Sequence, residues 1–154
     1  MKVANFEAWF NCHVWNPILG QAFGDMDVIT VIRGESTSLA SGTRKNTKRQ
    51  SGKWWKMGRR GDWILRFVNN GKKDEFGAGE AGKSWVDEHG TKFLKEAGLK
   101  LPKTLKDMLV KLMARARWEK ERCAKIQTVG AIHAGMYDLP TSAKKSICQA
   151  NIFN

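Results

Sequence analysis

The longest helical pattern in the chain is LPKTLKDMLVKLMARARWEKERCAKIQTV, residues Leu101–Val129. At about 100° per residue its inward-facing side chains fall within one arc of roughly 140°, and these are Leu105, Met108, Leu109, Leu112, Met113, Ala116, Cys123 and Ile126. An arc of this width is typical of a helix that covers a core. Pro102, a Thr104 cap and a capping-box Asp107 predict its start, and Gly130 predicts its end.

The opposite face of this helix is basic and includes a tryptophan. Lys111, Arg115, Arg122 and Lys125 gather there, with Trp118 among them. Such a ring either packs beneath another segment or stays exposed, where it can stack on a nucleic-acid base. Because large aromatic side chains are mostly buried, packing beneath the N-terminal segment or a loop is the first interpretation.

Charge is the compositional feature that departs most from the average. The 154 residues include 27 Lys and Arg against 15 Asp and Glu, a formal net charge of +12. This bias favours a polyanionic partner, first of all nucleic acid, either DNA or RNA. The length predicts one domain, residues 1–154. Without a signal peptide, a membrane-spanning run or a disulfide pattern, we expect a cytoplasmic protein and no membrane partner.

The rest of the chain alternates between helical and strand patterns. Shorter helices are predicted over 4–15, 83–96 and 140–150. Strands are predicted over 27–33, 53–57 and 62–68, the last two joined as a hairpin through Gly58–Gly61. Residues 69–82 read as a polar, glycine-rich loop. We therefore expect an α+β fold, in which a small antiparallel sheet of at least three strands packs against two or three helices, the longest about 103–128.

No acidic residue occurs between Ser36 and Gly61. The run contains eight basic residues, namely Arg44, Lys45, Lys48, Arg49, Lys53, Lys56, Arg59 and Arg60. Its first half is rich in Ser, Thr and Gly, which predicts a mobile basic loop at about 36–52. In the second half Trp54 and Trp55 are adjacent, so on a strand one of the two rings faces outward.

These features predict contacts with a phosphate backbone. Lys and Arg neutralise phosphates and release counterions, while an exposed ring stacks on an unpaired base. The predicted interface joins the eight basic residues and the two rings of this loop and hairpin to Lys111, Arg115, Trp118 and Arg122 of the long helix.

A second motif is GAGEAGKS at Gly77–Ser84, which matches G-x-x-x-x-G-K-[ST] and resembles the phosphate loop of GTPase-type nucleotide-binding proteins. The resemblance implies backbone N–H groups around a phosphate, with Lys83 on its charge and Ser84 on magnesium. However, a polar segment precedes the motif in place of a buried apolar strand. A second interpretation is that Gly77, Gly82, Lys83 and Ser84 hold a nucleic-acid phosphate at a helix N-terminus.

Carboxylates near the first predicted strand suggest a possible enzyme. Asp25 and Asp27, with Glu35 beyond the strand, are the carboxylates that a metal-dependent nuclease would use. The Glu-x-Lys pattern that accompanies such sites is missing, and the three histidines have no second ligand at zinc spacing.

We therefore predict a non-catalytic nucleic-acid-binding protein with no metal or cofactor. The first alternative is a small inhibitor or adaptor, of the kind a phage or mobile element encodes, whose basic surface binds an acidic patch on a protein complex. The second alternative is a nucleotide-binding or nuclease enzyme.

Overall fold

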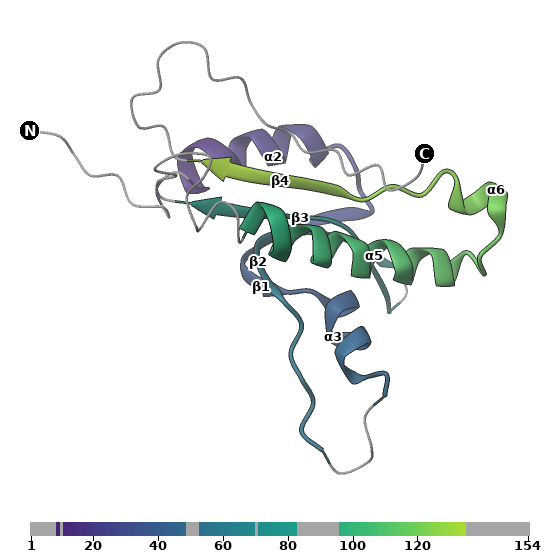
Figure 1. The fold of residues 1–154 in the computed structure, drawn as a ribbon. Helices are drawn as coiled ribbons and strands as arrows, with labels where there is room; N and C mark the ends of the chain where they lie inside the picture. The colour runs from purple at the N-terminus through teal and green to yellow at the C-terminus, as the bar shows by residue number, and fades with distance from the viewer. Residues whose placement is uncertain (1–8, 10, 49–52, 70, 83–95, 135–154) are drawn as a thin grey trace, which may run out of the picture.

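The computed structural model describes residues 9, 11–48, 53–69, 71–82 and 96–134 (Figure 1). It contains a four-stranded sheet in the order β1-β2-β3-β4, with β1 Ile29–Thr37, β2 Arg60–Asn69, β3 Lys72–Gly82 and β4 Val129–Ala134. β1, β2 and β3 are antiparallel neighbours, whereas β4 pairs parallel to β3. The α+β class is confirmed, and the sheet is mixed because α5 carries the chain back across it before β4 begins.

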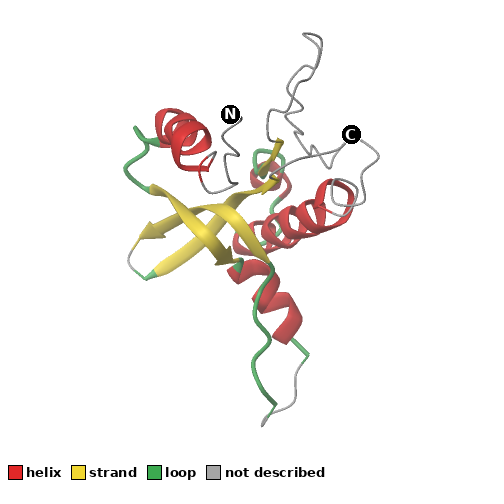
Figure 2. Cartoon of the chain, turned by 90° about the vertical axis from the view of Figure 1, so that its left-hand side faces the viewer, coloured by secondary structure: helices red, strands yellow, loops and turns green. Residues whose placement is uncertain are grey.

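The helical elements lie on both faces of this sheet (Figures 1 and 2). They are the π-helical turn η1 Asn11–Trp15, α2 Asn16–Phe23, α3 Leu39–Asn46, the π-helical turn η2 Glu96–Lys100, α5 Leu101–Arg115 and α6 Lys120–Cys123. In the part of the chain that the structure describes, every helix is too short or too polar to cross a bilayer.

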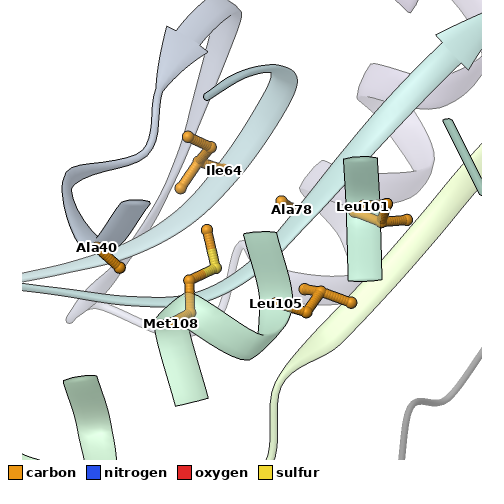
Figure 3. Packing of buried hydrophobic residues seen from close by; sticks show 6 residues of the cluster. All are labelled: Ala40, Ile64, Ala78, Leu101, Leu105 and Met108. Atoms are coloured by element: carbon orange, nitrogen blue, oxygen red, sulfur yellow. The ribbon is translucent and has the colours of Figure 1, made fainter. Parts of the chain in front are cut away.

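Among the residues that the structure describes, the core forms two clusters, one on each face of the sheet. On one face, α5 and the first turn of α3 contribute to a cluster (Figure 3) formed by Ala40, Ile64, Ala78, Leu101, Leu105 and Met108. On the other face, Leu19 of α2 packs with Trp63 and Leu65. The alternation predicted for β2 is therefore confirmed, since Ile64 faces α5 while its two neighbours face α2.

The predicted long helix is shorter in the structure. Its inner arc from Leu105 to Met113 is buried as expected, but α5 ends at Arg115. The Arg117 and Trp118 amides donate to Ala114 O and Met113 O, at 3.1 and 3.0 Å. Both of these residues have a positive φ, 55° and 59°, which turns the chain out of the helix. Gly130 does not cap this helix, because it lies in β4.

Three other boundaries also differ from the prediction. Pro17 does not end a helix, because it lies in the first turn of α2, where its missing N–H group costs no hydrogen bond. Most of the predicted 69–82 loop is β3, which follows a turn at Gly71 with φ 76°. The hairpin through Gly58–Gly61 is wrong, since β2 starts at Arg60 and the hairpin partner of β2 is β3. Predicted helices 83–96 and 140–150 lie almost entirely outside the described residues.

Candidate nucleic-acid interface

The segment between β1 and β2 projects from the body of the molecule as an arm. We define the arm as residues 38–48 and 53–59, that is, α3 with the turn after it and the returning chain before β2 (Figures 1 and 2). The sequence predicted a loop over 36–52, yet the structure has the end of β1 and α3 there. Helix α3 forms because Ser38 caps it, its Oγ accepting the Ser41 amide at 3.2 Å. Mobility of this segment stays a prediction.

A buried carboxylate fastens the start of α3 to the sheet. Glu75 of β3 is 1% exposed and accepts hydrogen bonds from the Leu39 and Ala40 amides, at 2.8 and 2.9 Å. The Ser38 hydroxyl donates to the same carboxylate at 2.8 Å. Arg66, which faces Glu75 across β2 and β3, completes the set with an ion pair of 2.8 Å. This full set of donors makes Glu75 a structural anchor, since its lone pairs are already engaged.

The returning chain is bonded to α3 along its length. Asn46 donates to Lys56 O at 2.8 Å and accepts the Lys56 amide at 2.9 Å, as a strand neighbour would. The Lys45 ammonium donates to Met57 O at 2.9 Å. At the base, the Ser38 amide donates to Arg59 O at 2.8 Å. Hydrogen bonds therefore join α3 to the returning chain from the base of the arm as far as Lys56.

Two of the predicted phosphate-binding arginines form ion pairs within the protein, although 53% of the Arg44 side chain stays exposed. Arg44 and Arg59 both pair with Asp107 of α5, each at 2.8 Å, and this carboxylate is nearly buried. Asp107 is therefore an ion-pair partner of the arm, in contrast to the capping role that the sequence predicted for it. Desolvation by burial lowers the pKa of Lys45, and the positive charges of Arg59 and Arg44 lower it further. The base of the arm is thus a site of concentrated positive charge.

Beyond these bonds, the end of the arm presents two aromatic rings to solvent. Trp54 is 94% exposed and Trp55 is 75% exposed. The sequence predicted one outward ring, and the structure exposes both because residues 53–57 are not part of the sheet. Lys53 and Lys56 flank the rings in the sequence and are exposed, as is Lys48. Arg60, the last basic residue of the predicted set, begins β2, and Arg49 lies outside the described residues.

The basic face of the long helix lies away from the end of the arm (Figure 1). Trp118 is 60% exposed, so the interpretation that it packs beneath another segment is wrong. Arg115 pairs with Asp74 of β3, and Arg122 pairs with Glu119 at 2.8 Å. Lys111 is half-buried. The structure therefore does not join these residues to the arm as one continuous surface.

The phosphate-loop pattern folds differently from the motif it resembles. Gly77 and Gly82 belong to β3, paired with β4 and, at Gly77, also with β2, so the chain is extended where the motif needs a loop. A Cβ atom at Gly77 would approach Val129 O to 2.6 Å, which explains this glycine by close strand packing. Lys83 and Ser84 lie outside the described residues.

The predicted carboxylate cluster does not form a strand face. Asp25 and Asp27 are exposed in the turn before β1, and Glu35 lies within that strand. Across the described residues, no three His, Cys, Asp or Glu side chains are grouped as metal ligands.

Sequence reasoning missed the residues that shape the arm, namely Asn46, Glu75 and Asp107. Only the Ser38 cap has a local signal, a serine directly before a short Ala-containing segment. No family model matches the chain, and no curated protein or solved structure is significantly similar to it.

Proposed function

We propose that this protein binds nucleic acid without catalysing a reaction on it, and that the arm makes the principal contacts. The observation that carries the proposal is the exposed pair Trp54 and Trp55 on a projecting segment that contains no acidic residue. Exposed lysines adjoin the rings, and lysines of this kind neutralise phosphates.

The internal ion pairs divide the predicted basic residues into two roles. Arg44 and Arg59 hold the arm to α5 through Asp107. Lys48, Lys53 and Lys56 extend from the arm and are the residues that we assign to phosphate contacts. Because the arm engages phosphates and base faces rather than base edges, we expect little sequence specificity.

The test is fluorescence anisotropy of labelled DNA and RNA oligonucleotides at several salt concentrations. Lys48, Lys53 and Lys56 are all replaced by glutamine in the arm variant. The matched control replaces Lys72, Lys73 and Lys103, which are exposed on β3 and α5. Both variants lower the formal net charge of +12 by the same amount, so they differ only in where the charge is lost.

We expect the arm variant to bind more weakly and to flatten the plot of log affinity against log salt. Each lost phosphate contact reduces the slope by about 0.7 to 0.9, so three contacts reduce it by about 2 to 3. The control variant should change the slope by less than about 1. Equal losses in the two variants would show that the arm is not the interface. In that case the exposed rings would be tested against an acidic protein partner by affinity capture.

A further inference from the structure

We infer that the arm recognises unpaired bases, so that its ligand is single-stranded DNA or RNA and not a duplex. This inference rests on the proposed function and names the substrate class of the same site. It is carried by two adjacent rings that are both solvent-exposed at the end of an otherwise bonded arm.

The tryptophans are too exposed to serve the fold. A core or covering role would bury most of each indole, whereas Trp54 keeps 94% and Trp55 keeps 75% of its surface in water. Large apolar surface left in water on a projecting segment is typical of a binding site. Consecutive rings can accept consecutive bases, since every base has a π-face whatever its identity.

A base pair inside a duplex has no free face for an indole. Both faces are covered by the neighbouring pairs, so a ring must first unstack a step before it can insert. An unpaired base meets the ring at once, with no such cost. The two rings therefore favour a single strand over a duplex of the same length.

The surrounding residues fit the same ligand. The order is Lys53-Trp54-Trp55-Lys56, which places one lysine on each side of the ring pair. The Cα atoms of these two lysines are no more than about 11 Å apart, because three residues cannot span more. Both charges can therefore reach phosphates next to the stacked bases.

The anchoring of this segment lowers the cost of binding. Lys56 is bonded to Asn46 through both its amide and its carbonyl, and Met57 O accepts from Lys45. The segment that presents the rings is thus already held against α3. The protein therefore loses less conformational entropy when single-stranded nucleic acid binds.

The experiment compares strands with duplex on the full chain. The probes are labelled 16-nucleotide dT and rU strands, and the duplex is relaxed, covalently closed circular DNA used as competitor, because it has no ends on which a ring could stack. The variants are Trp54→Ala, Trp55→Ala, both together, and Trp54→Phe with Trp55→Phe. The control is Trp9→Ala, a partly exposed tryptophan outside the arm.

We expect each alanine variant to lose about 5- to 150-fold in affinity for the strands and the double variant to lose more. Duplex competition should change by less than about two-fold, and phenylalanine should restore most of the strand affinity because it keeps a ring. Circular dichroism checks that each variant is folded. We expect no change in the spectrum, because the exposed rings of Trp54 and Trp55 do not contribute to the core.

Two results would overturn the inference. One is an affinity for duplex as high as the affinity for single strands. The other is a double alanine variant of Trp54 and Trp55 that lowers both affinities equally, or lowers neither. The arm variant, with Lys48, Lys53 and Lys56 replaced by glutamine, separates the two proposals. If it still binds nucleic acid more weakly and with a flatter salt dependence, the proposed function stands and only the single-strand assignment fails. If the unaltered protein binds neither strand nor duplex, both fail together.

Discussion

Trp63 and Gly79 face each other across β2 and β3, and this pair explains a glycine that the sequence leaves ambiguous. The indole lies directly over Gly79, where an added Cβ would overlap the ring atoms. Gly77 and Gly79 are therefore explained by close packing within the sheet, where a small residue admits a large cross-strand neighbour.

Gly79→Ala should lower the free energy of unfolding by about 1–3 kcal/mol, because the indole must leave its packed position. Urea unfolding monitored by circular dichroism measures the change. Gly98→Ala is the matched control, since a Cβ there meets nothing within 4 Å. A loss as large at Gly98 as at Gly79 would contradict the packing explanation.

The arm is the element whose shape decides the candidate site. The Asn46 side chain forms hydrogen bonds with both the N–H and the C=O of Lys56, as the backbone of a neighbouring strand would. A second element whose end depends on its surroundings is α5. It ends just before Arg117 and Trp118, which take positive φ although neither is a glycine.

Asn46→Ala removes both bonds to Lys56, each of which contributes about 0.5–1.5 kcal/mol. We expect the 53–59 segment to open about 5- to 150-fold more often while global stability changes much less. Hydrogen exchange of peptides covering this segment, read by mass spectrometry, reports the opening. Thr47→Ala is the control, since its hydroxyl donates only to Thr43 O within α3. Unchanged exchange in the Asn46 variant would show that the two bonds do not hold the returning chain.

At the scale of the whole molecule, two buried carboxylates attach the arm to the body. Glu75 of β3 holds the start of α3 and pairs with Arg66 of β2. Asp107 of α5 holds Arg44 and Arg59 from the two halves of the arm. The sheet and its covering helix therefore fix the direction in which the arm projects.

Glu75→Gln should lower the free energy of unfolding by about 3–5 kcal/mol, because it leaves Arg66 buried without a charged partner. The NH2 group of the glutamine would also replace an oxygen that accepts hydrogen bonds, so that donor would face donor. The control is Glu119→Gln, which breaks an exposed ion pair with Arg122 and should cost less than about 1 kcal/mol. Chemical denaturation compares the two, and similar losses would refute the anchoring role of Glu75.

The sequence by itself determined the features that depend on neighbours along the chain. The inner arc of α5 and the alternation of Trp63, Ile64 and Leu65 follow from the periods of a helix and a strand, so both were predictable. The acid-free run that becomes the arm was also evident, since charge is counted directly from composition.

Only the tertiary structure decided which of those residues remain available. Arg44 and Arg59 look equivalent to Lys53 in the sequence, but Asp107 from a distant helix forms ion pairs with both arginines, whereas Lys53 is exposed. The strand at 72–82 likewise depends on β2, which pairs with residues 72–79, and on β4, which pairs with residues 77–82, because a glycine-rich segment has little strand propensity of its own. Pairing and burial are long-range contacts, and no local period encodes them.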